Sequence, residues 1–449
     1  MQVYLVGGAV RDKLLGIDKA DRDYVVVGST VENMLKNGFS QVGQDFPVFL
    51  HPKTHEEYAL ARTERKNGHG YLGFNCDFNE NITLEEDLIR RDLTINAIAM
   101  DEDGKLYDPF HGVDDLKNKV LRHVSGAFVE DPLRVLRVAR FYARFCYLGF
   151  TIAPETKELM RKIALSGELK ALTPERIFIE LQKALSTKSP EEFILALREV
   201  EALKEVLPEV DKLFGIPGPM RWHPEIDSGI HTCMTLKKCA SETDCPVTRF
   251  AMLCHDLGKG ETPTILWPHH RLHNQLGEKP LKCLCQRLKV PVEYEQFAHL
   301  VVLYHSEMHH LYRNGPEGIV TLFNKLDAWR RPERVEPFTL CCKCDFLGRK
   351  GFEDRPFPRA DYFLQMFSIC QEVKAKEFVE LGFIGKDIGE KMMEKRALLI
   401  EEYVKTIPLN ELDDSNNEVP ANIKPKDITY ERKPQNKVLH QKGFFKVRI

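Results

Sequence analysis

The sequence predicts an α+β protein with a small mixed sheet near the N-terminus and a longer, mostly helical part behind it. "QVYLVGG" (2–8) and "YVVVGS" (24–29) are short apolar runs that end at glycines, which is typical of buried strands. "VFLHPKTHEEYALAR" (48–62) has the pattern of a β-hairpin. After about residue 131 helical spacing replaces the strand pattern, as in "EDPLRVLRVARFYARF" (130–145) and "PERIFIELQKALS" (174–186).

Length and composition limit the class of protein. The chain has 449 residues, enough for two to four domains, and its 43% hydrophobic and 29% charged residues suit a soluble globular protein. The net charge of −3 gives no overall sign of nucleic-acid binding, so any basic surface must be local. Neither a secretory signal nor an apolar run of about 18 residues is present, so we expect a cytoplasmic protein without a membrane span. Its 12 cysteines are then expected to be reduced thiols.

Changes in pattern along the chain predict five segments. The segments are a mixed-sheet head (1–140), a helical neck with a nucleobase- or RNA-binding region (141–220), a histidine-rich helical domain (221–350), a helical C-terminal segment (351–408), and a polar Pro/Asn-rich tail expected to be disordered (409–449).

The segment "ADRDYVVVG" places two carboxylates just before a strand. Asp21 and Asp23 are two residues apart, so in extended backbone they point to the same side, about 7 Å apart at Cα. Such a pair can hold divalent cations for in-line displacement at phosphorus, and Mg²⁺ suits carboxylate and phosphate oxygens. Glu57, in the second arm of the predicted hairpin, is a candidate third carboxylate. The alternative is that all three are solvated loop or strand residues.

Glycines and arginines near these carboxylates suit a phosphate ligand. In "YLVGGAVRD", Gly7 and Gly8 end a strand and begin a helix, where backbone N–H groups can approach an anion, and Arg11 follows in the first turns. Arg91, in "IRRDLTINA", offers a guanidinium fork for a triphosphate. Taken singly, these residues are more typical of a tight turn and of surface or capping groups.

The segment "EDPLRVLRVARFYARF" predicts a helix with arginines on one face, because Arg134, Arg137, Arg140 and Arg144 lie three, three and four residues apart. Asp131 is a natural helix N-cap. A carboxylate with an arginine also matches the edge that cytosine and adenine share, an exocyclic amine beside a ring nitrogen, and it mismatches uracil and guanine. Asp131 and Arg134 are therefore candidates for base selection, and Arg137 and Arg140 for phosphate contacts.

The motifs "GGAVRD", "DRD", "RRDLTINA", "DPFHG" and "EDPLRVLRVARF", in this order and spacing, resemble the bacterial class II tRNA nucleotidyltransferases. These are the CCA-adding enzymes of the polymerase-β-like superfamily, and the similarity to their long bacterial form covers about residues 1–405. The resemblance implies Mg²⁺-dependent, template-independent addition of CCA to the tRNA 3′ end and acceptor arm from CTP and ATP, with no DNA partner. The oligomeric state stays open. By position, Asp21 and Asp23 resemble the metal-binding pair, and Asp131 and Arg134 resemble the residues that select the base. Five further residues resemble the family's nucleotide-binding positions: Gly8, Arg11, Arg91, Arg137 and Arg140.

The helical second half carries a separate set of histidines and aspartates. His231, His255, Asp256 and Asp345 could supply nitrogen and oxygen ligands to one divalent metal that activates a water for attack on a phosphoester. His223, His273 and His305 are further candidates. The pattern H…HD…D resembles the HD phosphohydrolase superfamily. For the long bacterial CCA-adding form, the resemblance implies metal-dependent phosphatase and 2′,3′-cyclic phosphodiesterase activities. Mixed His and Asp ligands leave the metal open among Mg²⁺, Mn²⁺ and Ni²⁺.

Three alternative interpretations remain open at this stage. A bacterial poly(A) polymerase would share the N-terminal half. In an HD phosphohydrolase with a nucleotide-sensing head, hydrolysis by the second half would be the main activity. An inactive RNA-binding protein would not need the carboxylates.

Overall fold

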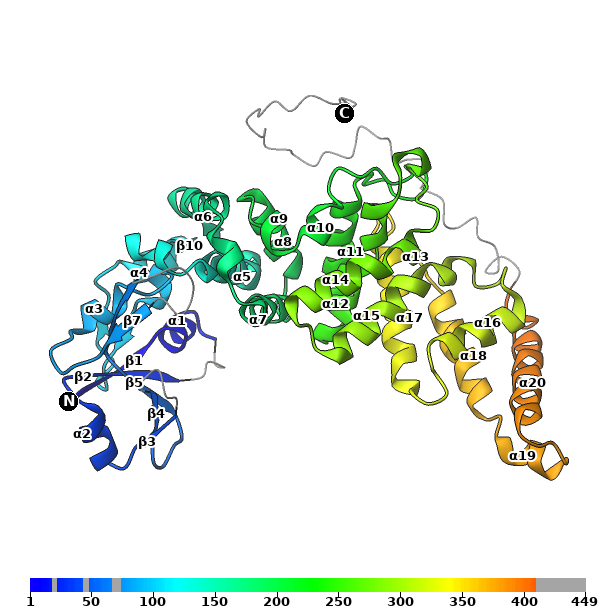
Figure 1. The fold of residues 1–449 in the computed structure, drawn as a ribbon, viewed down its shortest axis with the longest axis horizontal. Helices are drawn as coiled ribbons and strands as arrows, with labels where there is room; N and C mark the ends of the chain where they lie inside the picture. The colour runs from blue at the N-terminus through cyan, green and yellow to red at the C-terminus, as the bar shows by residue number, and fades with distance from the viewer. Residues whose placement is uncertain (18–21, 43–47, 67–73, 409–449) are drawn as a thin grey trace. The chain divides into compact units, whose positions relative to one another are not determined.

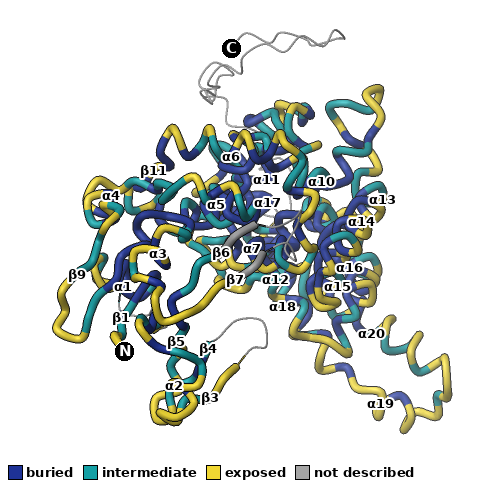
Figure 2. Tube along the Cα trace, turned by 60° about the vertical axis from the view of Figure 1, so that its left-hand side comes forward, coloured by how far each residue is buried: buried dark blue, intermediate teal, exposed yellow. Residues whose placement is uncertain are grey.

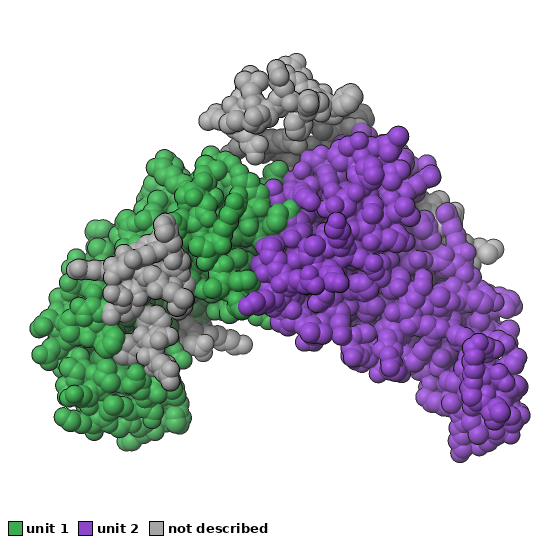
Figure 3. All heavy atoms as spheres, viewed as in Figure 1, with its two compact units in different colours: residues 1–208 green, residues 209–449 purple. Residues whose placement is uncertain are grey.

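The computed structural model describes residues 1–17, 22–42, 48–66 and 74–408. The chain divides into two compact units that meet between Pro208 and Glu209 (Figure 3). The predicted head boundary at residue 140 falls inside one continuous helix, Leu133–Phe145. The finer division into five segments stays a prediction, and the predicted tail (409–449) lies outside the described residues.

The first unit is built on a mixed seven-stranded sheet with the strand order β3-β4-β5-β2-β1-β8-β9. Figure 1 labels β1 to β5 among its strands. The strands of the sheet are β1 (Gln2–Val6), β2 (Asp23–Val27), β3 (Ser40–Gln41), β4 (Val48–Leu50), β5 (Glu57–Leu60), β8 (Ala99–Met100) and β9 (Leu106–Tyr107). β2 pairs antiparallel with β1 and parallel with β5, while β4 and β5 form an antiparallel pair. The α+β class, the two buried strands and the hairpin are therefore confirmed.

Two small two-stranded sheets accompany the main sheet. They are formed by β6 (Thr63–Lys66) with β7 (Phe74–Asp77) and by β10 (Val120–Leu121) with β11 (Thr151–Ile152).

Apolar residues of β2 are buried on both faces of the sheet. Val25 belongs to a cluster with Tyr4, Val6 and Ala99, whereas Val26 packs with Met34, Phe49 and Leu60 in a second cluster. Successive side chains of a strand point to opposite faces, so the run of valines anchors β2 from both sides. This double anchoring fixes the position of the strand end at Asp23.

Helices follow and cover the sheet, and the later ones extend the first unit. The helices are α1 (Gly8–Leu14), α2 (Val31–Lys36), α3 (Leu84–Leu88), α4 (Gly112–Asn118), α5 (Leu133–Phe145), α6 (Pro154–Ser166), α7 (Pro174–Leu185), α8 (Pro190–Glu199) and α9 (Leu203–Val206). α1 contacts β1, and α5 packs against both α7 and α8. The predicted arginine helix is α5, and Asp131 Oδ1 accepts a hydrogen bond from Leu133 N at 3.0 Å, as the predicted cap requires.

The described residues of the second unit are mostly helical, with one isolated β-bridge between Pro217 and Asp227. Beginning with α10 (Pro208–Asp211) at the boundary, it contains α11 (Ser228–Glu242), α12 (Pro246–Cys254), α13 (His273–Leu276), α14 (Glu278–Leu288), α15 (Val292–Tyr304), α16 (Gly315–Lys325), α17 (Val335–Leu347), α18 (Arg359–Gln371), α19 (Ala375–Glu380) and α20 (Lys386–Val404). α11, α12, α15 and α17 pack on one another, whereas α19 is mostly exposed (Figure 2). None of the helices in the described ranges has the length and apolar composition that a membrane span needs.

Candidate active sites

Two neighbouring inner strands of the main sheet begin with predicted carboxylates, which are thereby brought together. Asp23 begins β2 and Glu57 begins β5, and the two residues are register partners in the parallel pair. Both are exposed, and neighbouring strands lie about 4.8 Å apart. Like charges directly opposite each other destabilise a sheet, and a bound cation removes that cost. The pair therefore suits Mg²⁺, while Asp21 lies outside the described residues.

The glycine turn lets two arginines approach the backbone. Gly7 has a φ of +66°, a conformation that favours glycine, and a Cβ built there would lie 2.9 Å from a terminal nitrogen of Arg91. A Cβ on Gly8, the first residue of α1, would lie 3.4 Å from a terminal nitrogen of Arg11. Small residues at this turn therefore make room for both guanidinium groups.

Arg11 lies inside the first unit. It is 2% exposed, and its guanidinium donates to Asp12 Oδ1 at 2.7 Å and to Asn96 Oδ1 at 2.5 Å. The same group lies over the rings of Phe141 and Phe145 at about 5 Å. Burial lowers the pKa of Arg11, and Asp12 partly offsets that effect. In this geometry Arg11 connects α1 to α5, and its predicted contact with a nucleotide is not tested.

The arginines of α5 have separate partners within the first unit. Arg134 donates to the backbone carbonyls of Ala127 at 2.6 Å and Arg90 at 2.5 Å. The other three form ion pairs: Arg137 with Asp92 at 2.7 Å, Arg140 with Glu180 at 2.6 Å, and Arg144 with Asp12 at 2.8 Å. The helix face predicted from the spacing thus holds the sheet to the helices behind it. These contacts also fix where the side chains of Arg134 and Arg137 point.

Asp131 has an ion-pair partner that the sequence reasoning missed. Arg176, on α7, lies with a terminal nitrogen 2.7 Å from Asp131 Oδ2, while Oδ1 accepts from Leu133 N. The two residues are 45 positions apart, so no local spacing indicates the pair. The signal in the sequence that could have indicated this partner was the position of Arg176 at the start of the amphipathic segment "PERIFIE".

The four predicted metal ligands of the second unit converge. His231 lies on α11, His255 and Asp256 directly follow α12, and Asp345 lies on α17. His231 Nε2 is 3.0 Å from Asp345 Oδ1, and His255 Nε2 is 3.2 Å from Asp256 Oδ2. All four side chains belong to residues that are at most 3% exposed. Buried imidazole nitrogens and carboxylate oxygens facing one another form a donor set for a divalent cation.

Two of the further candidates join the same buried histidine cluster from another side. His273 Nε2 lies 3.5 Å and His305 Nε2 3.8 Å from Asp256 Oδ1. Burial lowers the pKa of His273 to about 4 and that of His305 to about 3, so both are neutral at pH 7. Neutral imidazole is the form that binds metals.

His223 lies beside the histidine cluster with a glutamate that the sequence analysis did not identify. Glu225 Oε1 is 3.0 Å from His223 Nδ1 and 2.8 Å from His231 Nδ1. Burial raises the pKa of Glu225, but hydrogen bonds from the two histidines outweigh it and lower the pKa overall. Glu225 is therefore ionised and holds the His231 ring from the side away from Asp345.

Cationic and polar groups surround the histidine cluster, and none of them was predicted. Lys259 Nζ is 2.6 Å from Asp256 Oδ2, and His309 Nε2 is 2.8 Å from Asp345 Oδ2. Arg349 lies 3.5 Å from the same carboxylate and 3.0 Å from His309 Nε2. The signal for Lys259 was its position three residues after the His-Asp pair, and Arg349 similarly follows Asp345 by four.

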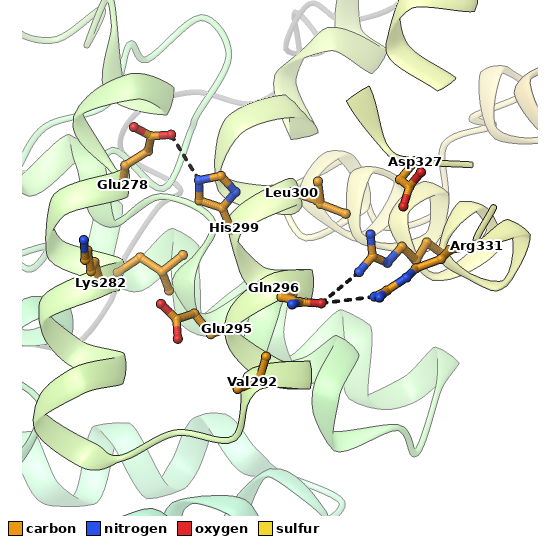
Figure 4. A pocket seen from close by; sticks show the side chains of 11 residues that line it. Glu278, Lys282, Val292, Glu295, Gln296, His299, Leu300, Asp327 and Arg331 are labelled. Carbon is orange, nitrogen blue, oxygen red and sulfur yellow. Dashed lines mark hydrogen bonds and ion pairs between the residues drawn. The ribbon is translucent and has the colours of Figure 1, made fainter. Parts of the chain in front are cut away.

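A separate surface cavity of about 730 Å³ lies between α14, α15 and the segment before α17 (Figure 4). Its lining residues include Glu278 and His299, which form a hydrogen bond of 3.0 Å, and Arg331, which donates to Gln296. None of the lining residues belongs to the buried histidine cluster. His299 is thus a histidine of α15 outside that cluster.

Comparison with known protein families identifies the class of the first unit. The family described as "Poly A polymerase head domain" matches residues 3–122, and "Probable RNA and SrmB- binding site of polymerase A" matches residues 149–214. These matches show that the sheet-containing part of the first unit is similar to a polymerase head domain, and that the helical part after it is similar to an RNA-binding segment of the same polymerases.

Two curated relatives cover nearly the whole chain. The Multifunctional CCA protein of Vibrio campbellii is 55% identical over 397 residues, which is 88% of this chain and 98% of the relative. That of Shewanella frigidimarina is 55% identical over 403 residues, covering 90% and 97%. The chain belongs to the multifunctional CCA protein family, the long form of the bacterial class II CCA-adding enzymes.

Solved structures show the same fold at low sequence identity. A CCA-adding enzyme from Bacillus stearothermophilus, in complex with CTP, has a TM-score of 0.62 at 21% identity and covers 89% of each chain. A Thermotoga maritima CCA-adding enzyme, complexed with tRNA, has a TM-score of 0.56 at 22% identity and covers 91% of this chain and 92% of that one.

Proposed function

We propose that the first unit adds and repairs the 3′-terminal CCA of tRNA from CTP and ATP with release of pyrophosphate. The observation that carries this proposal is the register pair of Asp23 and Glu57 at the end of a doubly anchored strand, in a chain of the CCA-adding family. Asp21 and Asp23 would hold Mg²⁺, with Glu57 beside them. The cation would supply charge neutralisation for the attacking 3′-hydroxyl and the leaving pyrophosphate.

The protein's own part in this reaction is positioning. Arg91 lies against the backbone of Gly7, where a guanidinium can meet the triphosphate of a nucleotide whose α-phosphate faces Asp23. In the proposed site, the Asp131 carboxylate and the Arg134 guanidinium would supply the acceptor and the donor that the shared edge of cytosine and adenine requires. Arg176 holds Asp131 in place, so it supports base selection without contacting the base.

The second proposed activity is phosphoester hydrolysis in the second unit, on phosphomonoesters and 2′,3′-cyclic phosphates. The chemistry of the buried donor set fits a divalent cation, because the His255 Nε2 atom and the Asp256 carboxylate meet at 3.2 Å without a hydrogen bond. His231, His255, Asp256 and Asp345 would hold Mg²⁺, Mn²⁺ or Ni²⁺, which would supply an activated water and polarise the phosphoester. Lys259 and Arg349 offer positive charge for phosphate oxygens.

A nucleotide-addition assay tests the first activity. Full-length protein is given tRNA lacking CCA with each labelled nucleoside triphosphate, and incorporation of C and then A is expected. Asp23→Asn should lower incorporation by about 10³-fold, the scale of losing a main electrostatic group. Glu56→Gln is the matched control, since this neighbouring carboxylate faces Arg22 and should leave the rate unchanged. A long A tract would instead indicate a poly(A) polymerase, and no incorporation would refute both.

A hydrolysis assay tests the second activity on the same protein. His255→Ala and Asp345→Asn should abolish release of product from 2′,3′-cyclic nucleotides and from p-nitrophenyl phosphate, with CCA addition retained. The Asp23→Asn variant should show the reverse. Loss of both activities together in one of these variants would contradict two independent sites.

A further inference from the structure

The exposure of its side chains shows from which side a substrate can reach the histidine cluster. The side chains of His231 and His255 are at most 1% exposed. Those of His223, His273 and His309 are 13%, 19% and 14% exposed. A substrate therefore reaches the cluster at these three partly exposed histidines.

Two loops border this open side, and they are joined to each other. The first loop (217–227) carries His223, and the second (262–272) leads directly into His273. His270, in the second loop, has its Nε2 atom 2.8 Å from a backbone carbonyl oxygen of the first loop. Since that oxygen accepts the Nε2 proton, a hydrogen bond holds the loops together. We call the two loops the lip.

The lip presents large apolar side chains to solvent. Ile265 is 89% exposed, the highest fraction for a large apolar side chain among the described residues, and Leu272 is 63% exposed. Met220 is exposed as well, and Trp222 is half-buried. Leu272 and Trp222 each directly precede a histidine of the open side. Exposed apolar groups gathered beside a polar site are typical of a surface that contacts a ligand.

Trp222 is the aromatic group of the lip that can stack on a ligand. Two of the chain's three tryptophans lie in the lip, but the indole N–H of Trp267 donates to the carbonyl oxygen of Thr262 at 3.2 Å and so supports its own loop. Arg221 Cζ lies 5.1 Å from the centre of the Trp222 ring. An indole stacks on any nucleobase, because every base has a π-face, and a guanidinium suits phosphate oxygens.

We propose that the lip holds the nucleobase of a nucleoside phosphoester, with Trp222 stacked on the base and with Ile265 and Leu272 beside it. Consecutive Cα atoms are about 3.8 Å apart, so one nucleotide can contact Trp222 with its base and the open side at His223 with its phosphoester. The proposal rests on the proposed hydrolase function and adds a substrate class. Phosphoesters that carry a base are preferred over those that carry none.

The test compares hydrolysis of adenosine 2′-monophosphate and glycerol 2-phosphate by the full-length protein. Both are phosphate esters of a secondary alcohol, and only the first carries a base. Trp222→Ala should raise the KM for the adenosine ester about 10-fold, within the range expected for one base–aromatic stack, with kcat nearly unchanged. Glycerol 2-phosphate should be hydrolysed as before, and Trp222→Phe should restore most of the affinity.

A second pair of variants separates the lip from exposed apolar surface in general. Ile265→Ser should raise the KM for the adenosine ester more weakly than Trp222→Ala, because it removes an aliphatic contact and leaves the stack. Ile384→Ser is the matched control, since Ile384 is 77% exposed on the turn between α19 and α20, and it should change neither KM.

A binding measurement separates failure of the lip from failure of the hydrolase function. Isothermal titration of adenosine 2′-monophosphate after EDTA treatment, which prevents turnover, should show weaker binding by Trp222→Ala than by the parent protein; binding by the head is common to both. Hydrolysis of both esters with an unchanged KM in Trp222→Ala refutes the lip and leaves the hydrolase proposal standing. No hydrolysis of either ester refutes the hydrolase proposal, and equal affinities in the titration then refute the lip too.

Two further outcomes would also overturn the assignment. An equal loss of activity on both esters in Trp222→Ala would show that the residue supports the cluster and does not contact the base. Slower CCA addition to tRNA in this variant, with hydrolysis unchanged, would show that the lip contacts the body of the RNA instead of a single nucleobase.

Discussion

At the residue scale, the proposed role of His231 and His255 as metal ligands depends on the contacts of their Nδ1 atoms. His255 Nδ1 meets the carbonyl oxygen of Met252 at 2.7 Å, and His231 Nδ1 meets Glu225 Oε1 at 2.8 Å. These contacts set the ring orientation and leave Nε2 facing the cluster. Among the described residues, Glu225 is the carboxylate that contacts His231 Nδ1 and so orients the ring.

Replacing Glu225 should weaken metal binding without removing a ligand. We expect Glu225→Gln to lower the affinity of the full-length protein for Mn²⁺ by about 10- to 100-fold, the usual effect of losing such a partner. Isothermal titration of metal measures the change, and CCA addition should be unaffected. Glu225→Asp, which keeps the charge, should recover part of the affinity. Equal affinity in Glu225→Gln and the parent protein would contradict a positioning role.

The ion pair of Asp131 with Arg176 gives a second prediction for single residues. Asp131→Ala should relax the choice of base, so that incorporation of U or G rises relative to C and A. Arg176→Ala should produce a weaker form of the same effect, because it frees the Asp131 carboxylate without removing it. Competition between labelled nucleotides measures selectivity. Unchanged C and A selectivity in Asp131→Ala would reject the base-selection hypothesis.

At the scale of elements, α5 is the connection between the sheet and the helices of the first unit. Its arginines reach Asp12 at α1, Asp92 beyond α3 and Glu180 on α7. Asp92 also accepts from Leu93 N at 2.8 Å and from Asn96 Nδ2 at 2.9 Å. Burial raises the pKa of Asp92, but Arg137 and the hydrogen bonds outweigh it, so the pKa lies below its usual value.

Neutralising Asp92 should therefore reduce stability in a pH-dependent way. Because its pKa is lower in the folded than in the unfolded state, its contribution is complete above about pH 4 and is lost as the pH falls through the folded-state pKa. At pH 7, Asp92→Asn should cost about 2 kcal/mol, less than a fully buried pair, since the Arg137 side chain is 35% exposed.

Denaturant unfolding at pH 7 and at lower pH measures this difference. The gap between Asp92→Asn and the parent protein should narrow as the pH falls below 4. Asp114→Asn, whose side chain is 65% exposed, is the control and should have little effect at either pH. A gap that stays constant with pH would show that the charge of Asp92 is not the cause.

At the scale of the whole molecule, the two candidate sites lie in different compact units. Asp23 and Glu57 lie in the unit that ends at Pro208, and the histidine cluster lies in the unit that begins at Glu209. Asp23 and Glu57 are exposed at the first residues of β2 and β5, whereas the histidine cluster is buried between helices of its own unit. Metal removal should therefore affect the two units differently.

Chelation should lower the stability of the second unit more than that of the first. A ligand present at 100 times its Kd stabilises the folded state by about 2.7 kcal/mol. We expect calorimetry to show that the unfolding transition of the second unit shifts to lower temperature after dialysis against EDTA. Adding Mn²⁺ should restore the original transition temperature. His255→Ala should remove this shift, and Asp23→Asn should keep it. A shift retained in His255→Ala would place the stabilising ion elsewhere.

The sequence predicted much of this architecture because the relevant signals are local. Short apolar runs that end at glycine predicted β1 and β2, and the three- and four-residue spacing of arginines predicted α5. The His-Asp pair identified His255 and Asp256, and the structure brings His231 and Asp345 to it from α11 and α17. The partners that were missed, Arg176, Glu225 and His309, share no local pattern with the residues they contact.

The sequence by itself determined the fold class, the family motifs and the residue types of both candidate sites, because hydrophobic periodicity and short motifs act over a few neighbouring residues. Only the tertiary structure decided which groups face each other. It placed Glu57 opposite Asp23, committed the α5 arginines to ion pairs and backbone carbonyls within their unit, and turned the two oxygens of Asp256 toward different histidines. These pairings depend on helix packing and strand register, which join residues far apart in the chain and leave no local trace in it.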